Sequence, residues 1–267
     1  MKQIYLVIAA AVFLYACTAE KKQTRTSSKM EVIAYYTGNS ETIDQYSVEK
    51  LTQIIFSFGH LKGNNLHISS ARDTATIQKL VSLKSRNPSL KVLLSLGGWG
   101  GCSSCSEVFS TEKGRRDFVQ STKELFQYFK TDGIDLDWEY PAIAGYPGHV
   151  CSPADKDHFT QLVQELRTAL GKKAVISFAA GGFDRFLEQS IDWKKVMPLI
   201  NNVNLMSYDL VSGFSKVTGH HTGLYSTEKQ KQSADNAIRY FLNEKLPVNK
   251  IIIGSAFYAR GWDSVST

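Results

Sequence analysis

The chain has no dense run of lysine and arginine with aromatic residues between them, although its formal net charge is +6. Because the basic residues are scattered, we do not expect a nucleic-acid partner. No Gly-rich loop follows the first predicted strand, which argues against a nucleotide-binding sheet. The pair Cys102 and Cys105 has neither a second such pair nor a nearby histidine at metal-ligand spacing, so no zinc site is predicted.

The apolar run over residues 4–14 is too short to span a membrane as a mature helix. With Lys2 before it and the small residue Ala16 before Cys17, residues 1–17 are predicted to be an export signal. The ending resembles a bacterial lipoprotein cleavage box, and residues 18–30 form a polar linker behind it, so we expect Cys17 to carry a lipid. The alternative is ordinary signal cleavage that discards Cys17. We therefore expect export to the bacterial cell envelope, on the periplasmic or outer surface, or otherwise secretion.

Three further cysteines, Cys102, Cys105 and Cys151, make an odd number in an oxidising compartment. One disulfide and one free thiol are the simplest outcome. Both cysteine regions follow predicted strands, which favours a bridge between the two loops, from Cys151 to either Cys102 or Cys105. Which of the two is the partner stays open.

Short apolar segments rich in branched and aromatic residues alternate with segments of helical periodicity. The predicted strands are 31–37, 51–58, 91–96, an acidic stretch from 131, 173–178, 203–207 and 250–257. The predicted helices are 73–86, 111–130, 153–170, 192–200 and 227–246. Seven strands alternating with helices predict a parallel sheet covered on both faces, either doubly wound or closed. Polar and aromatic residues recur at the carboxyl ends of many strands, which favours an α/β barrel of the TIM type in one domain.

The stretch over residues 131–141 carries three acids at alternating positions. On a strand, Asp135, Asp137 and Glu139 share one face and the apolar residues between them share the other. Same-face neighbours lie about 7 Å apart, so we expect these carboxyl groups to share protons and titrate as a coupled set. The alternative is a solvated edge strand, but Asp has low strand propensity and adds no packing there. Glu139, at the mouth of the strand, is predicted to be the proton donor.

Residues 132–139 match every fixed position of the pattern D-G-x-D-x-D-x-E, and here the sequence resembles the glycoside hydrolase family 18 chitinases. Ser95, Gly97 and Gly98 match a second motif of that family, S-x-G-G. The resemblance covers nearly all of residues 31–262 and implies a (β/α)8 barrel, with residues 31–267 as the catalytic domain. Family members continue beyond seven units through an inserted module, an eighth strand and a last helix. We therefore expect an incomplete, C-terminally truncated barrel of about seven units, poorly stable or inactive in isolation.

The resemblance also implies roles for individual residues. Glu139 would protonate the glycosidic oxygen, Asp137 would orient the substrate's acetamido group, and Asp135 would share a proton with Asp137. Tyr208 would hydrogen-bond the acetamido group, and Asp132, at the strand's start, would be structural. The residues expected to line the substrate site are Tyr36, Phe58, Gly98, Trp99, Tyr140, Met206, Asp209, Tyr258 and Arg260.

The implied reaction is hydrolysis of β-1,4 links in chitin or chitooligosaccharides with retention, in which the substrate's own acetamido oxygen is the nucleophile. It requires neither a metal nor an organic cofactor. We expect a monomer that meets the membrane only through its lipid. One alternative is an endo-β-N-acetylglucosaminidase that acts on the chitobiose core of N-glycans. The other is a non-catalytic chitin-binding lectin on the same barrel, but such relatives typically lose the terminal acid that this chain keeps in Glu139.

Overall fold

The computed structural model describes residues 30–265. The predicted export signal over residues 1–17, the lipidation site Cys17 and all but the last residue of the predicted linker lie outside these residues.

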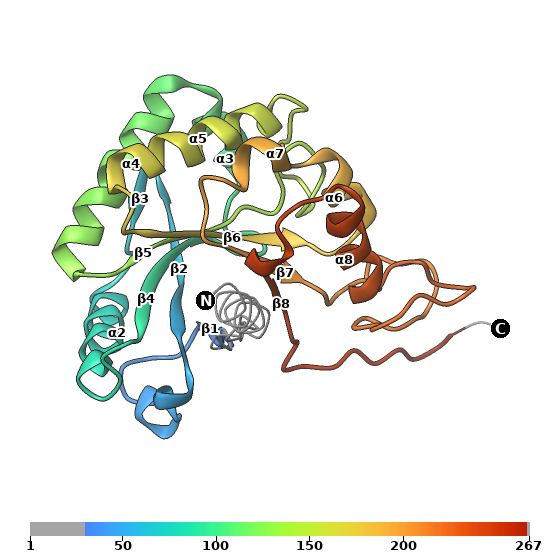
Figure 1. Cartoon of the computed structure of the whole chain (residues 1–267), viewed down its shortest axis with the longest axis horizontal. Coiled ribbons are helices and arrows are strands. Elements are labelled where there is room, and N and C mark those ends of the chain that lie inside the picture. The colour runs from blue at the N-terminus through green and yellow to red at the C-terminus, as the bar shows by residue number, and fades with distance from the viewer. Residues whose placement is uncertain (1–29, 266–267) are drawn as a thin grey trace, which may run out of the picture. The chain divides into compact units, whose positions relative to one another are not determined.

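Seven strands form a parallel sheet that curls on itself, with the order β1-β2-β4-β5-β6-β7-β8 (Figure 1). Every neighbouring pair along this path is parallel, and no pairing joins β1 to β8 within residues 30–265. The predicted TIM-type architecture is confirmed: the parallel sheet is curled like a barrel wall and contains seven strands. The strands are β1 (Ile33–Tyr36), β2 (Gln53–Lys62), β4 (Lys91–Gly97), β5 (Gly133–Asp137), β6 (Val175–Gly181), β7 (Asn202–Met206) and β8 (Ile251–Ile253).

Helices cover the outer face of the sheet, and α4, α5 and α7 lie side by side there (Figure 1). Four of the helices begin at a side chain that accepts a hydrogen bond from the backbone of the first turn: Ser70 for α2, Thr111 for α4, Asp192 for α7 and Ser233 for α8. The helices are α2 (Ala71–Ser82), α3 (Cys105–Ser110), α4 (Glu112–Phe129), α5 (Asp155–Leu170), α6 (Asp184–Gln189), α7 (Trp193–Val196) and α8 (Ala234–Asn243).

The hydrophobic core lies between the sheet and these helices. On β5 and just after it, Ile134, Leu136 and Trp138 are buried, and the Trp138 ring packs on Phe109 of α3 and Phe159 of α5. Because successive side chains on a strand point to opposite faces, this packing turns the acids between them into the lumen of the curled sheet. The alternation predicted from the sequence is therefore what directs the carboxyl groups inward.

Several boundaries differ from the sequence prediction. The helix predicted over 227–246 begins only at α8, because Ser233 caps it, and residues before the cap form a loop held by Gln230. The antiparallel strand β3 (Asn65–His67), which extends β2 as a hairpin, was not predicted, nor were α3 and α6. These elements are too short for their sequences to show a helical or strand periodicity.

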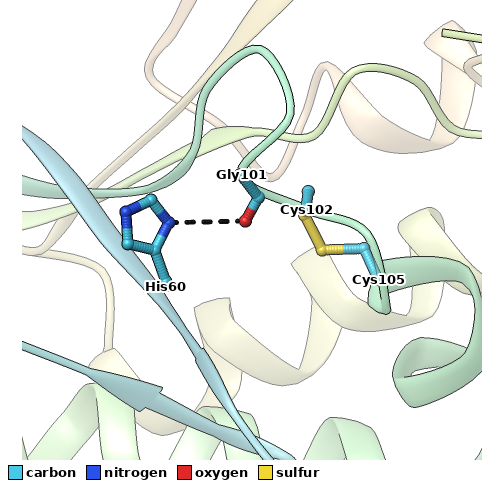
Figure 2. The surroundings of a disulfide bond; sticks show 4 residues. All are labelled: His60, Gly101, Cys102 and Cys105. Atoms are coloured by element: carbon cyan, nitrogen blue, oxygen red, sulfur yellow. Dashed lines mark hydrogen bonds between the residues drawn. A yellow bond between two sulfur atoms is a disulfide. The ribbon is translucent and has the colours of Figure 1, made fainter. Parts of the chain in front are cut away.

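The disulfide joins Cys102 to Cys105, whose Cα atoms lie 5.2 Å apart, and Cys151 is a free thiol. The predicted bridge between the two loops is therefore wrong. Cys105 donates its backbone N–H to the Cys102 carbonyl at 3.2 Å, so a tight turn at the start of α3 brings the two side chains together. Figure 2 shows this turn, with His60 from β2 facing the Gly101 carbonyl beside it at 3.4 Å.

Within residues 30–265, no helix has both the length and the apolar character needed to cross a membrane.

Candidate active site

Three polar residues on adjacent strands form a buried layer in the lumen. The strand register pairs Ser95 on β4 with Asp135 on β5, and Asp135 with Ser177 on β6. The two hydroxyl groups donate hydrogen bonds to the Asp135 carboxylate, Ser95 to Oδ2 at 2.8 Å and Ser177 to Oδ1 at 2.6 Å. The S-x-G-G serine thus supports the acidic motif directly.

Two further donors reach Asp135 from more distant strands. The Tyr35 hydroxyl on β1 donates to Oδ2 at 3.0 Å, and Asn204 Nδ2 on β7 donates to Oδ1 at 3.1 Å. Burial raises the pKa of Asp135, and the hydrogen bonds oppose that rise. An ionised carboxylate offers about four acceptor sites, so four donors saturate it. The proton sharing between Asp135 and Asp137 expected from the sequence would require one of these bonds to break.

Tyr35, which the sequence analysis missed, occupies the lumen in place of the predicted Tyr36. The Tyr36 side chain is buried on the other face of β1, where its hydroxyl donates to the Asn39 carbonyl at 2.6 Å. The expectation that Tyr36 faces the substrate site is corrected, because adjacent strand residues point to opposite faces. The run Tyr35-Tyr36 contains both candidates, and only the register against the neighbouring strands separates them.

Asp137 is only 6% exposed, and its Oδ1 has no hydrogen-bond partner among the described residues. Burial, followed by the charges of Glu139 and Asp135, raises the pKa of Asp137 well above its usual value. Burial without a donor to stabilise its anion thus favours the neutral form of Asp137. Its free oxygen remains available to a ligand.

Glu139 lies two residues beyond the end of β5 and lines the cleft. Burial raises its pKa to about 7, with the charge of Asp209 acting in the same direction and a hydrogen bond with Tyr140 against it. A carboxyl group with this pKa keeps its proton in mildly acidic solution. It can therefore act as an acid and, after losing the proton, as a base.

A cleft of about 490 Å³ opens above these carboxyl groups. It contains most of the residues predicted to bind substrate. Burial and the charges of Asp137 and Glu139 raise the pKa of the Tyr208 hydroxyl, which therefore stays protonated and can donate a hydrogen bond. The predicted residues in its lining are Phe58, Trp99, Asp137, Glu139, Tyr140, Met206, Tyr208, Asp209, Tyr258 and Arg260.

One side of the cleft is aromatic. The Trp99 ring lies 6.4 Å from Tyr140, 5.5 Å from Tyr146 and 6.1 Å from Phe214, measured between ring centroids. Phe214, in the loop after β7, is 71% exposed and lines the cleft, and the sequence analysis missed it. An exposed aromatic in a loop has no periodic signal, although a large apolar side chain held in solvent indicates a contact surface.

The other side of the cleft is polar and centred on Asp209. Its Oδ2 accepts the Tyr258 hydroxyl and its Oδ1 accepts Arg260 Nε, each at 2.6 Å. Burial raises the pKa of Asp209, but the bonds from Arg260 and Tyr258 outweigh this and hold it below its usual value. Asp209 therefore stays ionised within reach of Glu139.

The glycines of the S-x-G-G motif allow close packing beneath the cleft. Gly97 has φ +108°, and a Cβ there would collide with the Asp137 carbonyl. A Cβ on Gly98 would lie 2.7 Å from the Phe58 ring, and Gly98 supports that ring without lining the cleft. Asp132 lies at the opposite end of β5, where it accepts the Val92 backbone N–H at 2.8 Å, as a structural residue would.

In the part of the chain that the structure describes, no three His, Cys, Asp or Glu side chains cluster in a way that could hold a metal ion.

Comparison with known proteins agrees with this geometry. The model of glycosyl hydrolases family 18 matches residues 31–267. Mouse (Mus musculus) chitotriosidase-1 is 33% identical over 230 residues, which cover 81% of this chain and 48% of that protein. The chain thus spans about half the length of this relative.

Two solved structures share the fold. The chitinase domain of the spore coat protein CotE from Clostridium difficile has a TM-score of 0.80 and 30% identity, covering 90% of this chain and 68% of that one. A family 18 N-acetylglucosaminidase from Paenibacillus barengoltzii has a TM-score of 0.78 and 33% identity, covering 86% and 69%.

Proposed function

The chain belongs to family 18 of the glycosyl hydrolases, and on that premise we propose that it hydrolyses β-1,4 links between N-acetylglucosamine units of chitin or chitooligosaccharides. The observation that carries the proposal is that Oδ1 of buried Asp137 has no hydrogen-bond partner among residues 30–265 and lies in the same cleft as Glu139, whose pKa is raised to about 7. A buried acceptor without a donor is costly unless a ligand supplies one. The N–H of a 2-acetamido group is such a donor.

The reaction proceeds in two steps. Glu139 protonates the glycosidic oxygen while the acetamido carbonyl oxygen attacks the anomeric carbon, which breaks the glycosidic bond and forms an oxazolinium ion. Asp137 Oδ1 accepts the acetamido N–H and aims that carbonyl. The Glu139 carboxylate then removes a proton from water, which opens the oxazolinium ion with net retention.

The carboxyl groups divide the charge between them. Asp135, saturated by four donors, remains the fixed anion at the base of the site. Once Glu139 has given up its proton, Glu139 and Asp137 hold one proton between them. The resulting negative charge lies beside the cationic intermediate and stabilises it, because charge interactions are strong where water is excluded.

The test compares wild type, Glu139→Gln and the control Glu107→Gln, whose side chain is exposed on α3. We expect wild type and the control to cleave chitotetraose, and Glu139→Gln to lose about 10²–10⁴-fold in kcat while still binding it. Full turnover by Glu139→Gln would contradict the assignment. Two parallel assays test other activities. Cleavage of an aryl N-acetylglucosaminide would indicate removal of terminal sugars, and cleavage of a high-mannose glycopeptide would indicate action on N-glycans. Binding of chitotetraose by wild type without turnover would indicate a lectin.

We also propose that the chain is exported and anchored through a lipid on Cys17. The proposal is supported by the short apolar run, the small residue Ala16 and the polar linker that follows. Cys17→Ser should move the protein from the membrane fraction to the soluble fraction, whereas Cys151→Ser should not. Unchanged partitioning of Cys17→Ser would contradict the anchor.

A further inference from the structure

His221 lies in the loop between β7 and α8 and contacts the turn that carries Asp209. Its backbone carbonyl accepts the N–H of Leu210 at 3.1 Å, so the loop folds back onto the residue directly after Asp209. The His221 side chain is 12% exposed. This residue forms no part of the acidic motif and takes no part in the proposed reaction.

The His221 ring is held between two residues of the cleft's polar side. Its Nδ1 lies 3.6 Å from Asp209 Oδ1, and its ring lies 5.4 Å from the Tyr258 ring at 33° between the planes. Nδ1 is buried and has no hydrogen-bond partner among the described residues. A buried ring nitrogen that faces a carboxylate at slightly more than hydrogen-bond distance requires an explanation.

The Asp209 backbone also requires support. Its φ of +54° lies in the left-handed region, which residues other than glycine seldom occupy. The Leu210–His221 backbone bond and the approach of the His221 ring support this turn. From the turn, Asp209 accepts the bonds from Tyr258 and Arg260 that form the polar side of the cleft.

We propose that His221 is a positioning residue for substrate binding: its ring nitrogen holds Asp209, and through Asp209 it holds Tyr258 and Arg260 in the cleft. The proposal rests on the proposed glycosidase function. When a sugar chain fills the cleft, the Nδ1–Oδ1 contact shortens to a hydrogen bond, as polar contacts of unliganded sites commonly do. His221 therefore contributes chiefly to KM, since it touches neither the glycosidic oxygen nor the acetamido group.

Two substitutions separate the ring nitrogen from the ring's packing. His221→Asn keeps an N–H donor close to the position of Nδ1 and loses the ring that packs on Tyr258. His221→Phe keeps a ring there and loses the nitrogen. His220→Asn is the matched control, because the neighbouring His220 side chain is exposed and its backbone N–H bonds to Gln230.

With chitotetraose we expect His221→Phe to raise KM about tenfold with kcat within about threefold of wild type. His221→Asn should restore KM to within about threefold, and the control should match wild type. The proposal would be overturned if His221→Phe had the KM of wild type, or if KM rose equally in His221→Phe and His221→Asn. So would a fall in kcat at unchanged KM.

A measurement that needs no substrate keeps this test apart from the test of the reaction. The ¹⁵N NMR signal of His221 Nδ1 should shift when Asp209 is changed to Asn, and the His220 signal should stay in place. An unchanged His221 signal would overturn the proposed contact. If wild type cleaves none of the sugars but the His221 signal responds, the proposed reaction fails and the contact stands.

Discussion

The Tyr35 hydroxyl on β1 donates a hydrogen bond to Asp135 Oδ2 on β5 over 3.0 Å, although β2 and β4 lie between these strands in the sheet. The bond crosses the lumen, and Asn204 from β7 donates to both residues, to the Tyr35 hydroxyl at 2.9 Å and to Asp135 at 3.1 Å. One carboxylate therefore connects β1 and β7 across the lumen of the curled sheet. These bonds fix the Asp135 carboxyl group in the lumen, on the same face of β5 as Asp137.

Tyr35→Phe should lower kcat by about tenfold, because hydrogen bonds to a charged group contribute about 1.5–3 kcal/mol. The hydrogen bonds to Asp135 lower its pKa, so the loss of one donor lets burial raise that pKa further. Asp135 then competes for the proton that Asp137 and Glu139 need. Steady-state kinetics on chitotetraose measure the effect, with Tyr46→Phe as a control on an exposed ring. Equal kcat in the two variants would argue against a role for Asp135.

The activity should depend on pH through Glu139, which must be protonated to act as an acid. Since its pKa is about 7, kcat/KM should fall as the pH rises through that value. The charge of Asp209 raises the pKa of Glu139, so Asp209→Asn should lower it and move the alkaline limb to lower pH. A kcat/KM profile between pH 4 and pH 9 measures the shift. The control Asp157→Asn, at an exposed side chain, should keep the alkaline limb of wild type. An alkaline limb at the wild-type pH in Asp209→Asn would contradict the electrostatic coupling.

Stability should depend on pH through Asp137. Its folded pKa is raised above the unfolded value, so its contribution is fully present below the unfolded pKa and is lost as the pH rises through the folded pKa. Asp137→Asn carries no charge and should gain Tm relative to wild type as the pH increases. Thermal unfolding between pH 5 and pH 9 checks this. A Tm difference that is constant or shrinks with rising pH would show that Asp137 is not buried as the neutral acid.

The aromatic side of the cleft should bind the sugar rings of longer substrates. Trp99→Ala and Phe214→Ala should each raise KM for chitohexaose by about 2–10-fold, because an aromatic contact contributes about 0.5–1.5 kcal/mol. KM for chitobiose should change less, since a short chain reaches fewer rings. Tyr128→Ala, on an exposed ring of α4, is the matched control. Equal effects on short and long chains would argue against a binding surface at Trp99 and Phe214.

The acidic face of β5 could be predicted from the sequence because a period of two fixes which side chains share a face. Choosing between Tyr35 and Tyr36 required more, because adjacent residues on a strand always face opposite ways and only pairing with β2 decides which one enters the lumen. The cysteine pairing failed for a related reason. Two loops that follow neighbouring strands suggest a bridge between them, but the local turn at the start of α3 places Cys102 beside Cys105.

The loop after β7 was the least predictable part of the site. Phe214 and His221 reach the cleft and the Asp209 turn through irregular backbone, where no periodicity links sequence spacing to position in space. By contrast, Met206, Tyr208 and Asp209 lie on or directly after a strand, and their place at its carboxyl end followed from the predicted barrel. The residues that could be assigned before the structure thus lie in or near the quoted sequence motifs, whereas Phe214 and His221 lie in a loop without such a motif.

The most direct test of the account is the anomeric configuration of the first product. Time-resolved ¹H NMR of chitotetraose hydrolysis, recorded before mutarotation, should show the β-anomer at the new reducing end, because the acetamido oxygen and then water attack the same carbon from opposite sides. An initial α-anomer would require a single displacement by water and would contradict the roles of Asp137 and Glu139.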